Sequence, residues 1–258
     1  MSSASTARDR FARWLDADDD GDALRTYRRV FAAIWVAYDV VDLVWGATER
    51  SRIWFPHERS GDLVALQAVL VASGAMLALG RFVWISGMVA ALARGAEAFG
   101  YFALNDFFFA STVYLILAHS DGGPWGRGGR PRWVRDTLLA QLAWIYVATG
   151  ILKLNPDWLD GGQLFVRSQY LWTGQNWPYP AVVEKALSSV AVDARLAQAG
   201  AVSEIALGAV LFARRPYWLA AALVLAIHGF GALVTNVWFF SASMAAGVLI
   251  LMPRGRPA

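Results

Sequence analysis

The sequence has 258 residues, of which 57% are hydrophobic and only 17% are charged, and its mean hydropathy is +0.40. This composition excludes an ordinary soluble domain and predicts a polytopic membrane protein. The 13 Trp and 8 Tyr residues agree, because their rings favour the boundary between lipid headgroups and hydrocarbon. The absence of Cys excludes disulfides, thiolate nucleophiles and Cys-ligated metal centres. The net charge of +3 gives no indication of nucleic-acid binding, because basic residues set the topology of a membrane protein.

The polar N-terminal stretch 1–26 lacks the apolar core of a secretory signal, so we expect a retained cytoplasmic tail. It contains the pattern DADDDGD from Asp16 to Asp22, which matches the first half of a calcium-binding EF-hand loop. The bidentate Glu of such a loop is replaced by Tyr27, which favours a solvated acidic tail over a calcium site. We predict no metal site.

Apolar runs then divide residues 27–252 into a transmembrane domain, followed by a short cytoplasmic tail at 253–258. We expect an all-α bundle of about eight membrane-spanning helices, near 27–47, 62–80, 82–102, 105–118, 136–154, 197–213, 216–234 and 236–252. Most Lys and Arg residues fall on one side of this arrangement, which predicts a multi-pass cell-membrane protein with both termini cytoplasmic. The long segment 155–196 is rich in Trp and Tyr and is predicted to cap the outer face.

Ionisable residues within these spans are costly and need partners or a cavity. Asp39 and Asp42 share a helix face, where they form a polar cluster or meet a cation. Arg94 and Glu97 have the spacing of an ion pair within one helix.

Two further ionisable residues, Glu204 and His228, lie on different predicted helices and have no local partner. An interhelical contact in which the carboxylate orients the imidazole is one interpretation. Simple packing of His228 is the other.

Lys153 stands at the end of an apolar run, with no acidic residue three or four positions before it. Its side chain either reaches the membrane interface or serves as a general base, because a desolvated lysine loses its proton more readily.

The segment around this lysine, YVATGILKLNPDWLDG, resembles the signature of the vitamin K-dependent γ-carboxylase-like family, also called the HTTM family. The shared pattern is an aromatic residue, an Ala-x-Gly step, Lys-Leu, and Asp-Trp with a Gly three residues after the Trp. Weaker similarity covers the helices around Glu204 and His228, and together these extend from about residue 25 to 252.

The resemblance implies that Lys153 is the base that deprotonates a reduced quinone such as vitamin K hydroquinone. It also implies that Glu204 and His228 support catalysis and that Tyr146 and Trp158 bind the cofactor. His119 is similar in approximate position to the family's active-site histidine, although its surroundings match poorly and a loop histidine is the alternative.

The carboxylases of this family act on protein substrates, whose propeptide they recognise with a sizeable extramembrane region. A protein or peptide substrate is therefore an implication of the resemblance, but we do not expect protein γ-carboxylation from these 258 residues.

Two classes of function remain open from the sequence. One is a membrane enzyme in which Lys153 takes a proton from a quinol or another lipophilic acid. The alternative is a non-catalytic module that binds membrane lipids, a lipophilic small molecule or a protein partner. An ion-coupled transporter is less favoured, because the sequence has no inverted repeat or pair of broken helices.

Overall fold

A computed structural model describes most of the chain, and within the described residues the regular elements are all helices. The described ranges are 22–45, 61–100, 105–122, 131–164, 189–214, 216–235 and 238–252.

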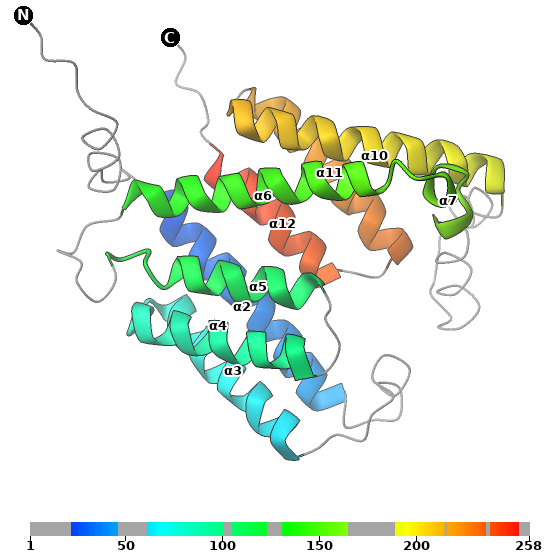
Figure 1. Ribbon diagram of the computed structural model, residues 1–258. Coiled ribbons are helices and arrows are strands. Elements are labelled where there is room, and N and C mark those ends of the chain that lie inside the picture. The colour runs from blue at the N-terminus through cyan, green and yellow to red at the C-terminus, as the bar shows by residue number, and fades with distance from the viewer. Residues whose placement is uncertain are drawn as a thin grey trace, which may run out of the picture. The chain divides into compact units, whose positions relative to one another are not determined.

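Eight long helices and one short helix make up these ranges, and each long helix coincides with one predicted apolar run (Figure 1). The long helices are α2 (Asp22–Trp45), α3 (Gly61–Leu79), α4 (Val83–Gly100), α5 (Asn105–Leu117), α6 (Arg132–Leu152), α10 (Val190–Ala213), α11 (Tyr217–Thr235) and α12 (Trp238–Leu251). The short helix is α7 (Pro156–Leu159). The predicted all-α class is therefore confirmed.

Several helices begin earlier than expected, including α6, which begins at Arg132 instead of 136. Helix α2 begins at Asp22, within the stretch predicted as a tail, and α10 begins at Val190 instead of 197. The sequence analysis assigned 155–196 to an outer cap because this long segment is rich in Trp and Tyr, but its end belongs to α10, where Asp193 is fully buried on the inner face. Most of the DADDDGD pattern, residues 165–188 of the predicted outer cap and residues 253–258 lie outside the described residues.

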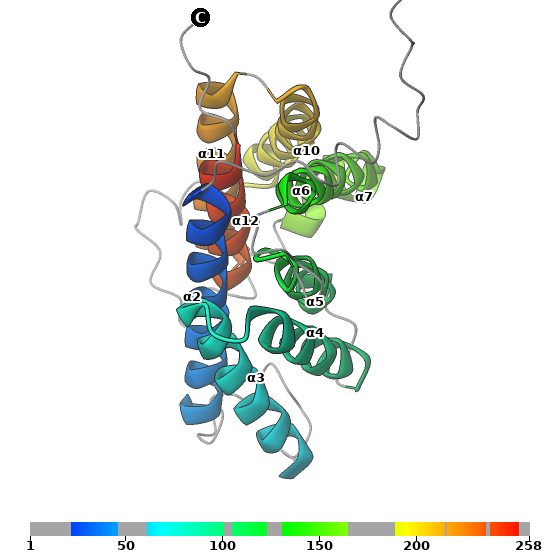
Figure 2. The same cartoon turned by 90° about the vertical axis from the view of Figure 1, so that its left-hand side faces the viewer.

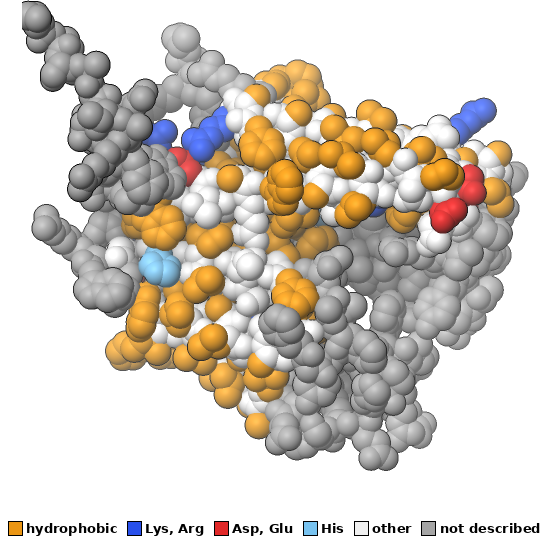
Figure 3. Space-filling view, in the orientation of Figure 1, with side chains coloured by type: hydrophobic (Ala, Val, Ile, Leu, Met, Phe, Trp, Pro, Cys, Tyr) orange, Lys and Arg blue, Asp and Glu red, His pale blue; other side chains and the backbone are white. Residues whose placement is uncertain are grey.

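Among the described residues, α10 is the one helix that is long and apolar enough to cross a membrane. Shorter apolar helical segments are Val64–Leu79, Phe107–Leu117, Tyr217–Gly231 and Phe239–Leu251. Many large apolar side chains are exposed, and hydrophobic side chains spread along the helices in Figure 3. Exposed apolar side chains of this kind are typical of helices that contact lipid.

The chain forms two compact units, and the boundary between them falls within α6, at Leu138. In the first unit, α4 and α5 pack antiparallel and α2 crosses them (Figures 1 and 2). Helix α4 comes closest to the end of α5 at Gly87, where a Cβ atom would lie 2.7 Å from Ala118 Cα. The Oγ atom of Ser111 on α5 also donates to Ala91 O on α4, at 2.7 Å.

The core of the first unit is aromatic. The ring of Phe31 on α2 lies edge-on to Tyr114 and Phe109 of α5, with centroid separations of 5.2 and 6.1 Å. All three side chains are buried, so these contacts hold α2 against α5.

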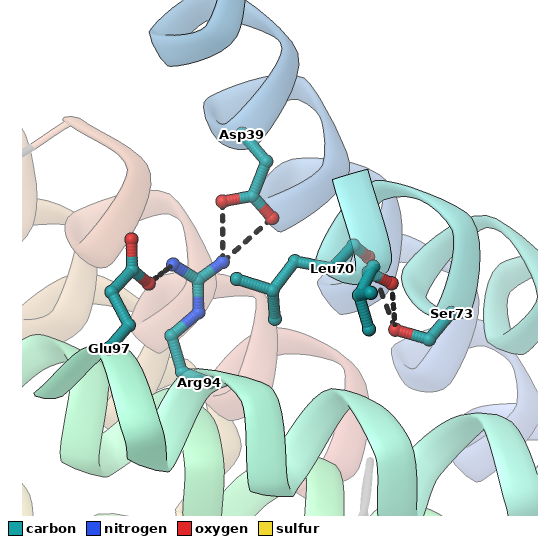
Figure 4. A network of polar contacts seen from close by, with 6 residues as sticks. Asp39, Leu70, Ser73, Arg94 and Glu97 are labelled. Carbon is teal, nitrogen blue, oxygen red and sulfur yellow. Dashed lines mark hydrogen bonds and ion pairs between the residues drawn. The ribbon is translucent and has the colours of Figure 1, made fainter. Parts of the chain in front are cut away.

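A buried charge network connects α2 to α4 in the same unit (Figure 4). One terminal nitrogen of Arg94 donates to both carboxylate oxygens of Asp39, each at 2.7 Å, and the other donates to Glu97. The predicted Arg94–Glu97 pair is therefore confirmed. One interpretation had Asp39 and Asp42 both meet a cation; Asp39 does so, and the side chain of Asp42 lies outside the described part of the structure. Aromatic rings surround the guanidinium group of Arg94. The nearest is Trp35, whose ring centroid lies 4.7 Å from Arg94 Cζ. The side chains of Asp39 and Arg94 have no exposed surface, so each requires the other.

We predict that Arg94→Leu destabilises the protein by about 3–5 kcal/mol, because it leaves two carboxylates buried without their cation. Thermal or denaturant unfolding in detergent measures the change. Arg29→Ala is a matched control, since Arg29 is an exposed arginine of α2 and its loss should change stability by less than about 0.5 kcal/mol.

A triple variant tests the electrostatic cause. Adding Asp39→Asn and Glu97→Gln to Arg94→Leu removes the unpaired charges and should recover a large part of the lost stability. If Arg94→Leu is as stable as Arg29→Ala, the network does not hold the two helices together.

Candidate functional site

The second unit contains α10, α11, α12 and most of α6, and its central feature is a close antiparallel crossing of α6 and α10. A Cβ atom on Gly150 would lie 2.9 Å from Ala201 O, and one on Gly208 would lie 2.8 Å from Ala143 O. Each distance is too short for a real side chain, so only glycine permits this approach. Small residues at such a crossing let two apolar helices gain van der Waals contact along their backbones.

The two sides of the crossing carry the same pattern of residues, which the sequence analysis did not identify. Ala-x-x-x-Val-Ala-x-Gly occupies 143–150 on α6, and Ala-x-x-x-Ile-Ala-x-Gly occupies 201–208 on α10. Gly150 faces Ala201 and Ile205, while Gly208 faces the equivalent Ala143 and Val147. The crossing therefore has an approximate two-fold relation, in which Tyr146 and Glu204 occupy equivalent positions.

After α6 ends, the segment that follows continues along α10 toward the N-terminus of that helix. The side chain of Gln198 on α10 donates to Leu159 O at 3.1 Å. Gly161 has a φ of +82° and packs on the α10 backbone, where a Cβ atom would lie 2.7 Å from the carbonyl carbon of Asp193. Both the positive φ and the close contact require glycine here. The stretch that carries the family resemblance is thus packed against α10.

This packing brings the predicted base Lys153 to Glu204. The Lys153 ammonium donates to Glu204 Oε1, and it also lies 5.0 Å from the centroid of the Trp158 ring. The side chain of Lys153 is 27% exposed, whereas that of Glu204 is 10% exposed. The pair therefore has a buried carboxylate and an ammonium that remains within reach of molecules outside the unit.

Two more of the predicted site residues pair with each other. The hydroxyl of Tyr146 on α6 and His228 Nε2 on α11 are 2.7 Å apart, and both side chains are buried. Phe240 of α12 lies edge-on to the imidazole, with ring centroids 6.3 Å apart. His228 is therefore positioned by a phenol, and Glu204 is hydrogen-bonded to Lys153, so the contact that one interpretation placed between Glu204 and His228 is not the one formed.

The two pairs are close along α6. Tyr146 and Lys153 are seven residues apart, so they share a helix face and are separated by about 10 Å along its axis. Lys153 lies just after α6, and its backbone N–H still donates to Thr149 O at 3.1 Å, which continues the helical pattern. The second unit thus gathers Lys153, Glu204, Trp158, Tyr146 and His228 around one crossing.

His119 belongs to the first unit and lies in the turn after α5. Its Nδ1 is 3.1 Å from Leu115 O, and its ring is 5.6 Å from that of Trp133. The same turn is held by the buried Arg28, which bonds Ser120 Oγ at 3.1 Å and Asp121 Oδ1 at 2.7 Å. These local contacts agree with the loop alternative for His119.

A buried acid that the sequence analysis placed in a loop also lies on α10. Asp193 is fully buried, and within the described part of the chain neither of its carboxylate oxygens has a hydrogen-bond partner. It shares the inner face of α10 with Glu204. Within the described ranges, no group of three or more His, Asp or Glu side chains has the arrangement of a metal site.

Comparison of this chain with protein-family models, with curated proteins and with solved structures finds no match.

We predict that Gly208→Ala and Gly150→Ala each destabilise the second unit by about 1–3 kcal/mol, because the new methyl group overlaps the opposing backbone. Thermal unfolding in detergent measures both. The matched control is Gly200→Ala on α10, where a Cβ atom meets nothing within 4 Å. It should be neutral or stabilising by up to about 1 kcal/mol, because alanine favours the helix. Equal effects at positions 200 and 208 would show that the crossing is not close-packed.

Proposed function

We propose that this chain is a multi-pass membrane protein whose second unit binds a lipophilic molecule with an acidic hydroxyl group, such as a quinol. The bound hydroxyl exchanges its proton with the Lys153–Glu204 pair. The observation that carries this proposal is the pair itself, a buried carboxylate joined to a partly exposed ammonium at a crossing of apolar helices.

Membrane insertion is supported by several features that agree with one another. Helix α10 has the length and hydropathy of a span. This helix and its neighbours also expose large apolar side chains, including Phe212 on α10, Trp144 on α6 and Trp218 on α11. The distribution of Lys and Arg along the sequence favours cytoplasmic termini.

The chemistry of the site fits a flat molecule with a polar tip. The Trp158 ring lies against the Lys153 ammonium, and the buried pair of Tyr146 and His228 rings lies about two helical turns from it along α6. The ammonium of Lys153 stabilises an oxyanion when the hydroxyl ionises, because opposite charges attract strongly away from bulk water. The resemblance of residues 146–162 to the carboxylase-like family supports the same class of ligand.

The same pair also favours a second function, a binding module without catalysis. A lysine that already has a carboxylate partner on another helix is satisfied without any reaction. In that case the site holds a lipid, a quinone or a protein partner, and the cation matters only for binding. Lys153→Arg then retains the bound partner, because arginine keeps the charge.

We predict that a lipophilic molecule co-purifies with the wild-type protein and is lost in Lys153→Ala. Native mass spectrometry with lipid extraction of the detergent-purified protein detects the molecule and identifies it. Arg29→Ala, which removes a positive charge at an exposed position of α2, is the control for a general effect of charge loss and should retain the ligand.

If neither protein carries a small lipophile, the second unit does not bind a quinol-like molecule. Crosslinking in the native membrane then tests the partner-binding alternative.

A further inference from the structure

We infer that Glu204, and not Lys153, receives the proton at this site, through its oxygen Oε2. This inference rests on the function proposed above and assigns the acceptor within the Lys153–Glu204 pair.

The hydrogen bonds of the two carboxylate oxygens carry the argument. Oε1 of Glu204 accepts from the Lys153 ammonium, whereas Oε2 is buried and has no hydrogen-bond partner among the residues that the structure describes. A buried carboxylate oxygen without a donor is unfavourable, since ionised oxygens normally accept two or more hydrogen bonds. A ligand hydroxyl that donates to Oε2 supplies the missing bond.

Lys153 cannot accept a proton in this arrangement. An ammonium has three donors and no acceptor. Its positive form is stabilised on two sides, by Glu204 Oε1 and by the face of the Trp158 ring at 5.0 Å. The acceptor of the pair that these contacts leave open is Glu204 Oε2.

Tyr146 and His228 do not replace Glu204 as the acceptor. The imidazole Nε2 and the phenol oxygen are engaged with each other at 2.7 Å, and Tyr146 lies about 10 Å from Lys153 along the α6 axis. Asp193 has two unpartnered oxygens, but it lies about 16 Å from Glu204 along the α10 axis.

The step balances in charge and in atoms. The O–H bond of the ligand breaks, and its electron pair stays on the ligand oxygen. The proton forms a new O–H bond with Glu204 Oε2, which makes this side chain a neutral carboxylic acid. Lys153 keeps its proton throughout, and its ammonium exchanges one anionic partner, Glu204, for the new oxyanion. The site therefore holds one positive and one negative charge before and after transfer.

The experiment uses an alkyl-substituted 4-nitrophenol as the probe, added to the full-length protein in detergent. Quenching of tryptophan fluorescence measures binding, and visible absorbance reports the phenolate. Infrared difference spectroscopy detects the C=O stretch of a protonated carboxylic acid. In the wild type we expect binding, phenolate formation and one new carboxylic acid band.

The variants identify the group that carries this band. Glu204→Gln should lose the band and Glu204→Asp should shift its frequency. Lys153→Arg should keep it, because arginine preserves the cation but cannot act as a base. Asp193→Asn is the matched control, a second buried acid on the same face of α10, and should leave the band unchanged.

The outcomes separate the inference from the function on which it rests. If the probe does not bind to the wild type, the proposed function fails. If it binds and ionises without a carboxylic acid band, or with a band that survives in Glu204→Gln, another group takes the proton. A probe that binds only as the neutral phenol also overturns the inference.

Discussion

The close approach of α6 and α10 is the constraint on which the candidate site depends. Gly150 and Gly208 let the two backbones meet, and this contact sets which side chains of one helix reach the other. Lys153 can reach Glu204 because it follows Gly150 by three residues, and Gly150 lies against Ala201 and Ile205 on either side of Glu204. Larger residues at the crossing would separate the helices, and the ammonium and carboxylate would separate with them.

Charge is accommodated differently in the two units. In the first, Arg94 lies in an aromatic cage with two carboxylates and has no exposed side-chain surface, which suits a permanent structural connection. In the second, the cation is partly exposed and its carboxylate keeps one oxygen unsatisfied. The contrast explains why we assign function to Lys153 and Glu204 and stability to Arg94, although both clusters place ionised groups in apolar surroundings.

Much of the fold could be predicted from the sequence, because apolar runs of sufficient length identify helices directly. The Arg94–Glu97 pair was also accessible, since a spacing of three residues fixes their proximity within one helix. The contact of Asp39 with Arg94 and that of Glu204 with Lys153 were not, because pairs between helices depend on how each helix is rotated about its axis. The start of α10 was missed because Asp193 resembles a loop residue until its burial is known. The repeated Ala and Gly pattern was visible in the sequence, but small residues are common in apolar helices and only the crossing gives them a role.

At the approximately two-fold crossing, the residues that set the distance between the helices differ from those that carry reactive groups. Its small residues set the distance between the helices, while the equivalent positions occupied by Tyr146 and Glu204 contribute little to that distance. One side now presents a phenol bound to a buried imidazole, and the other presents a carboxylate bound to an accessible amine. Such a crossing is evolvable, since either polar position can acquire a new reactive group while the scaffold that aims it stays unchanged.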